Sequence, residues 1–215
     1  MEGNQLINKL NSLFSWVTKL AYVNGLWMLF SLVGFIVVGF FPATVAMMTI
    51  CRKWLNGESE IPIFKTFVKT YKSALISSNL LGWILAGVGV LLYINFLVLQ
   101  ANTGQINVVT ISAYYLFLFF FLITVSHALP VFVYYRVSFF SCIRNAFIMG
   151  LLNVHLSIAI IISQSAFFYL MFSYPSTAVF FLGSILSVIQ MWLALLSFKR
   201  IDKKALKNKS VEAIV

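Results

Sequence analysis

The sequence predicts an all-α membrane protein: a bundle of about five transmembrane helices, with amphipathic helices at the membrane surface. Two observations predict this class. The chain is 61% hydrophobic and only 9% charged over its 215 residues, whereas a water-soluble domain carries about 25% charged residues. Three long stretches also contain no charged residue, at 20–51, 73–135 and 145–198. These stretches must be helical, because lipid cannot satisfy the open edge of a sheet.

The lengths of the uncharged stretches set the number of spans. A transmembrane helix needs about 20 apolar residues to cross about 30 Å of hydrocarbon. The second and third stretches each have room for two spans and a turn, whereas the first, with 32 residues, is too long for one span and too short for a comfortable pair. We therefore expect a transmembrane domain at 20–198 with five spans, near 20–41, 79–99, 108–130, 151–172 and 176–198.

Basic residues set the expected orientation, because lysine and arginine concentrate on the cytoplasmic side of membrane proteins. Thirteen of the fifteen basic residues lie in three regions, 42–78, 131–150 and 199–215, and five spans place these regions on one side. We expect a multi-pass cell-membrane protein with a basic cytoplasmic tail at 199–215 and an extracellular N-terminus, although Lys9 and Lys19 oppose that assignment. The net charge of +10 then reflects topology and attraction to a bilayer with anionic headgroups, and no nucleic-acid partner is expected.

Residues 1–19 are expected to form an amphipathic interfacial helix on the outer leaflet. The alternative is that they simply extend the first span. The helical spacing of the apolar residues puts six of them on one face: Leu6, Ile7, Leu10, Leu13, Phe14 and Val17.

A second surface region is expected after the first span, in residues 43–78. Pro42 lacks an amide hydrogen and is expected to break the span, after which 43–55 resumes as a short helix. Residues 62–78 then place an apolar stripe toward the lipid boundary and a lysine stripe toward headgroups. The candidate surface for a partner or for lipid is Lys65, Lys69, Lys72, Arg52, Lys53 and Trp54.

The same order of features recurs after the third span. Pro130 is expected to end that span, and 136–150 is expected to form another cytoplasmic surface helix. Asn153 then opens the fourth span much as Asn79 opens the second. This indicates a possible tandem repeat of span, proline break, surface helix and span, and the alternative is a chance similarity between apolar segments.

Small and polar residues within the spans are candidates for packing or function. The small residues Ser78, Gly82 and Ala86 recur every four positions, which favours close helix packing within the monomer or, alternatively, a homo-oligomer or partner interface. Intramembrane polar residues are functional candidates by default and could line a solute path. Most such side chains instead join helices by hydrogen bonds. The candidates are Asn24, His127, His155, Gln164 and Gln190.

Catalytic chemistry has almost no candidates in the sequence. The five acidic residues all lie in loops or termini, and motifs of hydrolases, phosphate-binding loops and zinc peptidases are absent. The two histidines, with Cys51 and Cys142, are not brought together by spacing into the three or four ligands that a metal site needs. We expect no enzyme activity, no catalytic residue, no metal and no cofactor.

The first loop resembles a known family. The matching positions are Phe41-Pro42-Ala43-Thr44, Trp54, Gly57-Glu58, Phe64-Lys65-Thr66-Phe67, Tyr71-Lys72, Asn79 and Gly82. They resemble the signature of the YesL-like family of bacterial membrane proteins of unknown function. The resemblance implies a small polytopic protein associated with ABC-type carbohydrate uptake systems, and hence an accessory role in contact with ABC permease subunits. The alternatives are a small-solute transporter or channel in its own right, or a membrane scaffold for a sensor.

Overall fold

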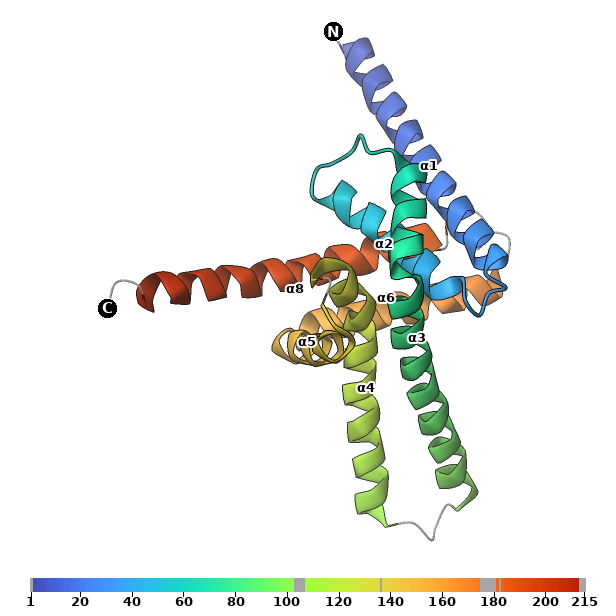
Figure 1. Ribbon diagram of the computed structural model, residues 1–215, viewed down its shortest axis with the longest axis vertical. Coiled ribbons are helices and arrows are strands. Elements are labelled where there is room, and N and C mark those ends of the chain that lie inside the picture. The colour runs from blue at the N-terminus through green and yellow to red at the C-terminus, as the bar shows by residue number, and fades with distance from the viewer. Residues whose placement is uncertain (1, 103–106, 136, 175–180, 182, 213–215) are drawn as a thin grey trace. The chain divides into compact units, whose positions relative to one another are not determined.

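The computed structural model describes residues 2–102, 107–135, 137–174, 181 and 183–212, and this part of the chain is almost entirely helical (Figure 1). The predicted all-α class is confirmed, with four or five helices that are candidates to span a membrane. The helices are α1 (Glu2–Val33), α2 (Phe40–Leu55), α3 (Ile63–Ala101), α4 (Val108–Tyr135), α5 (Phe139–Leu152), α6 (Val154–Ser173) and α8 (Gly183–Glu212).

Several of these helices are long and apolar enough to cross a membrane. Within the described residues they are Lys9–Val33 of α1, Ile63–Ala101, Val108–Tyr135 and Gly183–Asp202 of α8. The pair Phe139–Leu152 and Val154–Leu170 passes the same test together, but it is bent by 104° at Asn153. The chain therefore has four candidate spans, or five if the bent pair is one of them.

The chain divides into two compact units. The first contains Met1–Leu75 and Ser163–Ile189, and the second contains Ile76–Ile162 and Gln190–Val215. The helices α3, α6 and α8 each run from one unit into the other.

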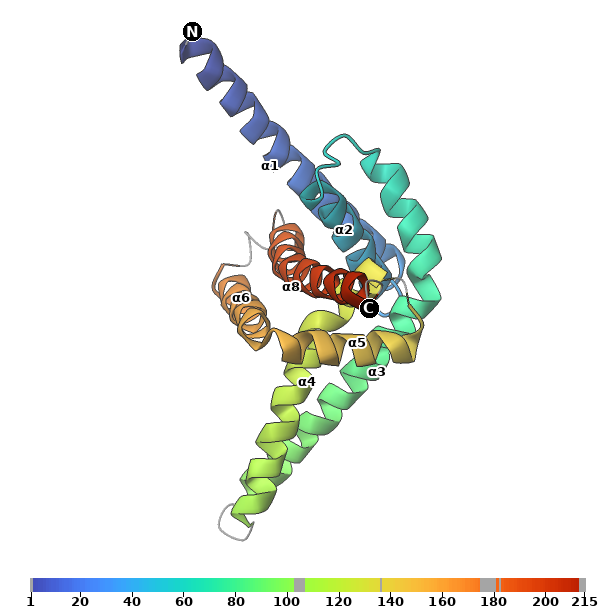
Figure 2. The same cartoon turned by 90° about the vertical axis from the view of Figure 1, so that its left-hand side faces the viewer.

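In the first unit, α1 and α2 pack side by side as an antiparallel hairpin (Figure 2). Trp27 Nε1 on α1 donates a hydrogen bond of 3.0 Å to Thr44 Oγ1 on α2. Further toward the N-terminus of α1, the rings of Trp16 and Trp54 meet edge to face at 5.5 Å. Most of α2 is buried, and its fully or nearly buried apolar residues are Ala43, Val45, Ala46, Met47, Met48, Ile50 and Cys51.

The first helix differs from the expected boundaries at both ends. Residues 2–33 form one continuous helix, so the predicted surface helix at 1–19 is the beginning of α1. No glycine or proline stands between Asn4 and Asn24, and nothing in the backbone therefore interrupts the helix near residue 19. At the other end, α1 stops at Val33 instead of continuing to residue 41.

The predicted break at Pro42 is wrong, because the chain turns earlier, between Gly34 and Gly39. These two glycines face each other so closely that a Cβ on Gly34 would meet the Cα of Gly39. Phe35 and Ile36 take left-handed conformations in this turn, with φ of 51° and 63°, which are strained for a β-branched residue such as isoleucine. Pro42 lies in the first turn of α2, where an amide hydrogen has no partner within the helix anyway.

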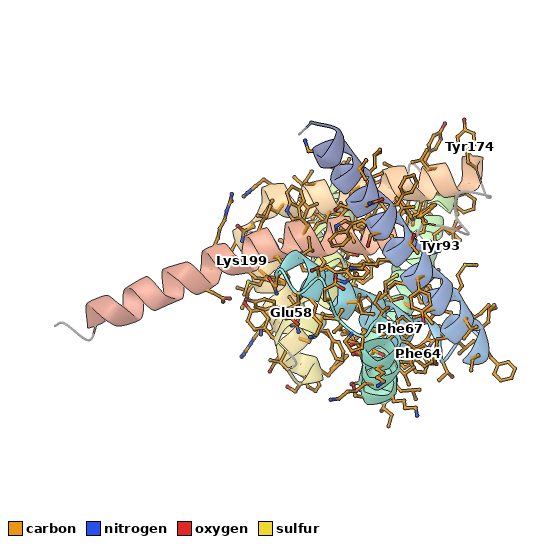
Figure 3. All side chains as sticks on the ribbon, turned by 90° about the horizontal axis from the view of Figure 1, so that it is seen from above. Glu58, Phe64, Phe67, Tyr93, Tyr174 and Lys199 are labelled. Carbon is orange, nitrogen blue, oxygen red and sulfur yellow. The ribbon has the colours of Figure 1, made fainter. Side chains whose placement is uncertain are left out.

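The helix α3 joins two elements that were expected to be separate, the surface helix at 62–78 and the span at 79–99. Its apolar stripe also faces protein, not lipid as expected. Phe67 and Tyr71 are buried, with ring centroids 5.3 and 5.0 Å from that of Phe30 on α1. The Tyr71 hydroxyl donates to the Phe30 carbonyl at 3.3 Å. Phe64, one turn earlier, remains 52% exposed (Figure 3).

In the second unit, the part of α3 after Leu75 and α4 form an antiparallel pair (Figures 1 and 2). Tyr114 links them, since its hydroxyl donates to the Leu92 carbonyl at 3.2 Å and its ring stacks on Phe96 at 6.5 Å. The prediction that Pro130 ends a span is wrong, because α4 continues through it to Tyr135. The carbonyl that Pro130 leaves without a helical donor finds one elsewhere, as the next section describes.

Candidate functional site

Three lysines form an exposed row on the first turns of α3, which we call the lysine face: Lys65, Lys69 and Lys72. Phe67 and Tyr71 lie buried on the opposite side of the same helix, so packing holds the lysine face in place. None of the three lysines is in an ion pair with another described residue, since the ion pairs found there join Lys19 to Glu60 and Lys53 to Glu58.

The other three residues of the predicted surface lie at the C-terminal end of α2 and have different surroundings. Arg52 is half-buried. Lys53 Nζ lies 2.7 Å from Glu58 Oε2 (Figure 3 labels Glu58), so its charge is largely compensated. Trp54 is buried against Trp16. The sequence therefore grouped six residues that the structure separates into an exposed lysine face and a partly neutralised helix end.

Asn24 connects α1 to the beginning of α8 inside the first unit. Its side chain is fully buried, and its Oδ1 accepts the backbone N–H of Ser184 at 3.2 Å. The first N–H groups of a helix have no partner within the helix, so Asn24 supplies an acceptor to α8 from a distant part of the chain. Gly183 makes this approach possible, because a Cβ there would lie 3.0 Å from Asn24 Oδ1 and 3.2 Å from Trp27 Cε3.

Gln190 forms the corresponding joint in the second unit, between α8 and α4. Its Nε2 donates a hydrogen bond of 2.9 Å to the backbone carbonyl of Ser126, and both residues are buried. The usual helical donor to that carbonyl is the amide four residues later, which is Pro130 and has no hydrogen. Gln190 therefore replaces the missing donor, which is how a proline becomes tolerable inside a membrane helix.

The two histidines have separate partners. His127 is fully buried, and its Nδ1 lies 3.1 Å from Ser126 Oγ and 3.4 Å from the Ile123 carbonyl, all on α4. His155 is exposed on α6 and its Nε2 accepts from Arg200 Nη1 of α8 at 3.2 Å. Among the described residues, no three histidine, cysteine or acidic side chains form a group suited to a metal ion.

The row of small residues on α3 lies in the second unit and is mostly buried there. Ser78 and Gly82 are buried, while Ala86 is half-buried. This burial favours close packing within the monomer over a free interface. Gln164 is half-buried on α6, and no contact with another described residue assigns it a role.

One polar contact between helices was not predicted from the sequence. Asp202 of α8 accepts the hydroxyl groups of Tyr134 at 2.9 Å and Tyr135 at 3.1 Å, both at the end of α4. The ring of Phe198 packs against both tyrosines, with centroid distances of 5.0 and 5.6 Å. The available signal was an adjacent tyrosine pair at a helix end together with a single acidic residue inside the basic start of the tail.

These features define a class: an all-helical protein with several helices long and apolar enough to span a membrane, joined by buried polar contacts, with an exposed lysine face on α3. Comparison with known proteins shows what the chain resembles. The family model described as "Protein of unknown function, DUF624" matches residues 20–96, which include α2, the turn before it and most of α3. The match covers the loop that resembles the YesL-like family, and YesL itself is among the relatives below, so this resemblance is confirmed.

Three curated relatives come from Bacillus subtilis (strain 168), and all three are described as uncharacterised. YesL is 29% identical over 96% of this chain and 98% of its own length. YesV is 28% identical over 86% of this chain and 89% of its own length. YteU is 28% identical over 89% of this chain and 86% of its own length. No solved structure matches the chain.

Proposed function

We propose that the protein is a non-enzymatic accessory component of an ABC-type uptake system for carbohydrates, most specifically oligosaccharides. The partner class is taken from the YesL-like resemblance, and the contact surface is taken from the lysine face on α3. The protein would lie in the cell membrane with its C-terminal tail in the cytoplasm, and the lysine face on the same side would contact a permease subunit.

The observation that supports this role is the fixed position of the lysine face. Lys65, Lys69 and Lys72 recur at i, i+4 and i+7 on α3, which spaces them by about 6 and 4.5 Å along the helix axis. Phe67 and Tyr71 anchor the opposite side to Phe30. Basic side chains on a rigid element suit recognition of an acidic protein surface, because electrostatic complementarity favours encounter and correct orientation.

The test is co-purification. The tagged protein is extracted from its native membrane in mild detergent, and the proteins that accompany it are quantified by mass spectrometry. Recovery of permease subunits and of a sugar-binding protein supports the proposal. Replacement of all three lysines of the lysine face by glutamine should then lower permease recovery at least about tenfold, which corresponds to about 1.4 kcal/mol of binding free energy.

A matched control removes the same amount of charge elsewhere. Lys9, Arg144 and Lys199 are also exposed, and replacing these three by glutamine should leave permease recovery within about twofold of the unmodified protein. If both triple variants lose the partner equally, net charge and not the lysine face is responsible. If the protein purifies alone and moves a labelled sugar into proteoliposomes by itself, it is a transporter and the accessory role is refuted.

A further inference from the structure

The two ends of the uncharged stretch 20–51 lie beside each other in the hairpin of α1 and α2. Charged and aromatic residues mark this end of the hairpin, which we call its base. Lys19 precedes the stretch on α1, and Arg52 follows it on α2. Beside them, the rings of Trp16 and Trp54 meet at 5.5 Å. Lys19 Nζ lies 2.9 Å from the Glu60 carboxylate in the loop after α2. The apolar stretch therefore begins and ends at the same end of the hairpin.

The opposite end of the hairpin is apolar and open. The turn between the two helices exposes four consecutive residues, and Phe35 is 88% exposed. A cluster of this kind marks contact with lipid or with another protein. Basic side chains prefer the headgroup level, so the lysine face on α3, which packs beside the hairpin at Phe30, belongs there and the tip of the hairpin points into the acyl chains. The tip consists of Phe35, Ile36, Val37 and Val38.

The arms of the hairpin are too short to cross a bilayer. Residues 20–33 of α1 and 40–51 of α2 extend over about 21 and 18 Å at 1.5 Å per residue. The hydrocarbon region is about 30 Å thick. Each arm therefore ends inside the membrane, and the chain has to return.

A full crossing by α1 conflicts with the position of the loop after α2. Lys19 lies ten residues into the candidate span Lys9–Val33, at about 15 Å from its start and hence near the midplane. Glu60 pairs with Lys19 and keeps 85% of its side chain exposed, so an exposed carboxylate would also lie at the midplane. That is among the most costly placements for a side chain in a membrane.

We propose that residues 20–51 form a re-entrant hairpin, which inserts its tip among the acyl chains of the cytoplasmic leaflet and returns to the cytoplasmic side. Four crossings then remain, by α3, α4, α6 with its bent partner α5, and α8. All fifteen basic residues become cytoplasmic, and the two external connections, 102–107 and 174–182, carry no charge. Lys9 and Lys19 no longer oppose the positive-inside rule, and the N-terminus is cytoplasmic instead of extracellular.

The lysine face limits how deeply the hairpin enters the membrane. The Tyr71 hydroxyl donates to the Phe30 carbonyl, so Lys72, the next residue on α3, lies level with Phe30, about 16 Å along α1 from Lys19. With the lysines at the headgroup level, where their stems cover apolar surface, only the tip of the hairpin enters the acyl chains. The hairpin does not depend on the partner proposed above, because it follows from contacts within α1, α2 and the loop after them.

Single-cysteine labelling tests the hairpin. Cysteine is introduced at Ser12, Ser59 or Asn102, which are all exposed, in a chain with Cys51→Ala and Cys142→Ala. A membrane-impermeant maleimide applied to intact cells should label only Asn102→Cys, and labelling of Ser12→Cys and Ser59→Cys should appear once the membrane is permeabilised. Labelling of Ser12→Cys in intact cells, with Ser59→Cys protected, would overturn the proposal because α1 would then cross the membrane.

The same test works if the alanine background fails to accumulate. Both native cysteines are buried, and a buried thiol with no access to solvent reacts poorly. The three cysteine variants can therefore be made in the chain that keeps Cys51 and Cys142, with the unmodified chain giving the background signal. The same two patterns of labelling support or overturn the hairpin.

Discussion

The hydrogen bond from Gln190 to α4 allows a quantitative prediction about Pro130. The Ser126 carbonyl has no helical donor because Pro130 lacks an amide hydrogen, and Gln190 Nε2 supplies one at 2.9 Å. Replacement of Gln190 by leucine keeps a side chain of similar size but leaves the buried carbonyl without that donor.

The size of the effect follows from two known ranges. An unsatisfied buried polar group costs about 1–3 kcal/mol, and interhelical hydrogen bonds in a membrane protein average about 0.6 kcal/mol with a maximum of about 1.7. We therefore expect Gln190→Leu to lower the free energy of unfolding by about 1–1.5 kcal/mol. In a Pro130→Ala background, the alanine amide can donate to the Ser126 carbonyl, and the cost of Gln190→Leu should fall below about 0.5 kcal/mol.

The free energies of unfolding are measured for the four members of this double-mutant cycle by denaturant titration in mixed micelles. Gln164→Leu is the matched control, since it makes the same chemical change at a half-buried glutamine of α6, and it should change stability by less than about 0.5 kcal/mol. If Gln190→Leu costs the same with alanine at position 130 as with proline, within about 0.3 kcal/mol, Gln190 does not compensate for the proline.

Three further predictions concern other joints of the protein. Gly150→Ala would place its Cβ against Ile123 Cγ2 and should lower the free energy of unfolding by about 1–3 kcal/mol. Adding Ile123→Ala should recover part of this loss, and no recovery would show that the contact is not the cause. Asp202→Ala removes the acceptor of two tyrosine hydroxyls and should cost about 1–3 kcal/mol in the same titration; an unchanged midpoint would contradict the joint. Val37→Asp should reduce the amount of protein in the membrane, because an aspartate in hydrocarbon costs up to about 3 kcal/mol. Ser59→Asp is its control, and equal amounts of both variants in the membrane would argue against insertion of the tip.

The fold class was predictable from the sequence, but the path of residues 20–51 was not. The absence of charge identified the stretch as apolar, and its length of 32 residues suited neither one crossing nor two. Hydropathy cannot distinguish a shallow hairpin from a crossing, because both bury uncharged residues in lipid. The informative signal was the pair Gly34 and Gly39, whose close approach permits the turn.

The two prolines show why local sequence rules failed at specific positions. Pro42 and Pro130 were both expected to end a helix, and neither does. Pro42 is harmless because it lies in the first turn of α2, which depends on where the preceding turn forms. Pro130 is tolerated because Gln190 donates to the freed carbonyl across 64 positions of sequence. Gln190 and Asn24 were recognised as candidates for joining helices, but their partners are backbone groups, which have no signature in the sequence.

The side of the membrane on which α1 begins tests the central claim most directly. Green fluorescent protein, which does not become fluorescent when exported unfolded, is fused ahead of Met1, and alkaline phosphatase, which is active only outside, is fused there in a parallel chain. The re-entrant hairpin predicts a fluorescent membrane-bound fusion and an inactive phosphatase. A dark first fusion with an active phosphatase, both at full length in the membrane, would place the N-terminus outside and contradict the hairpin.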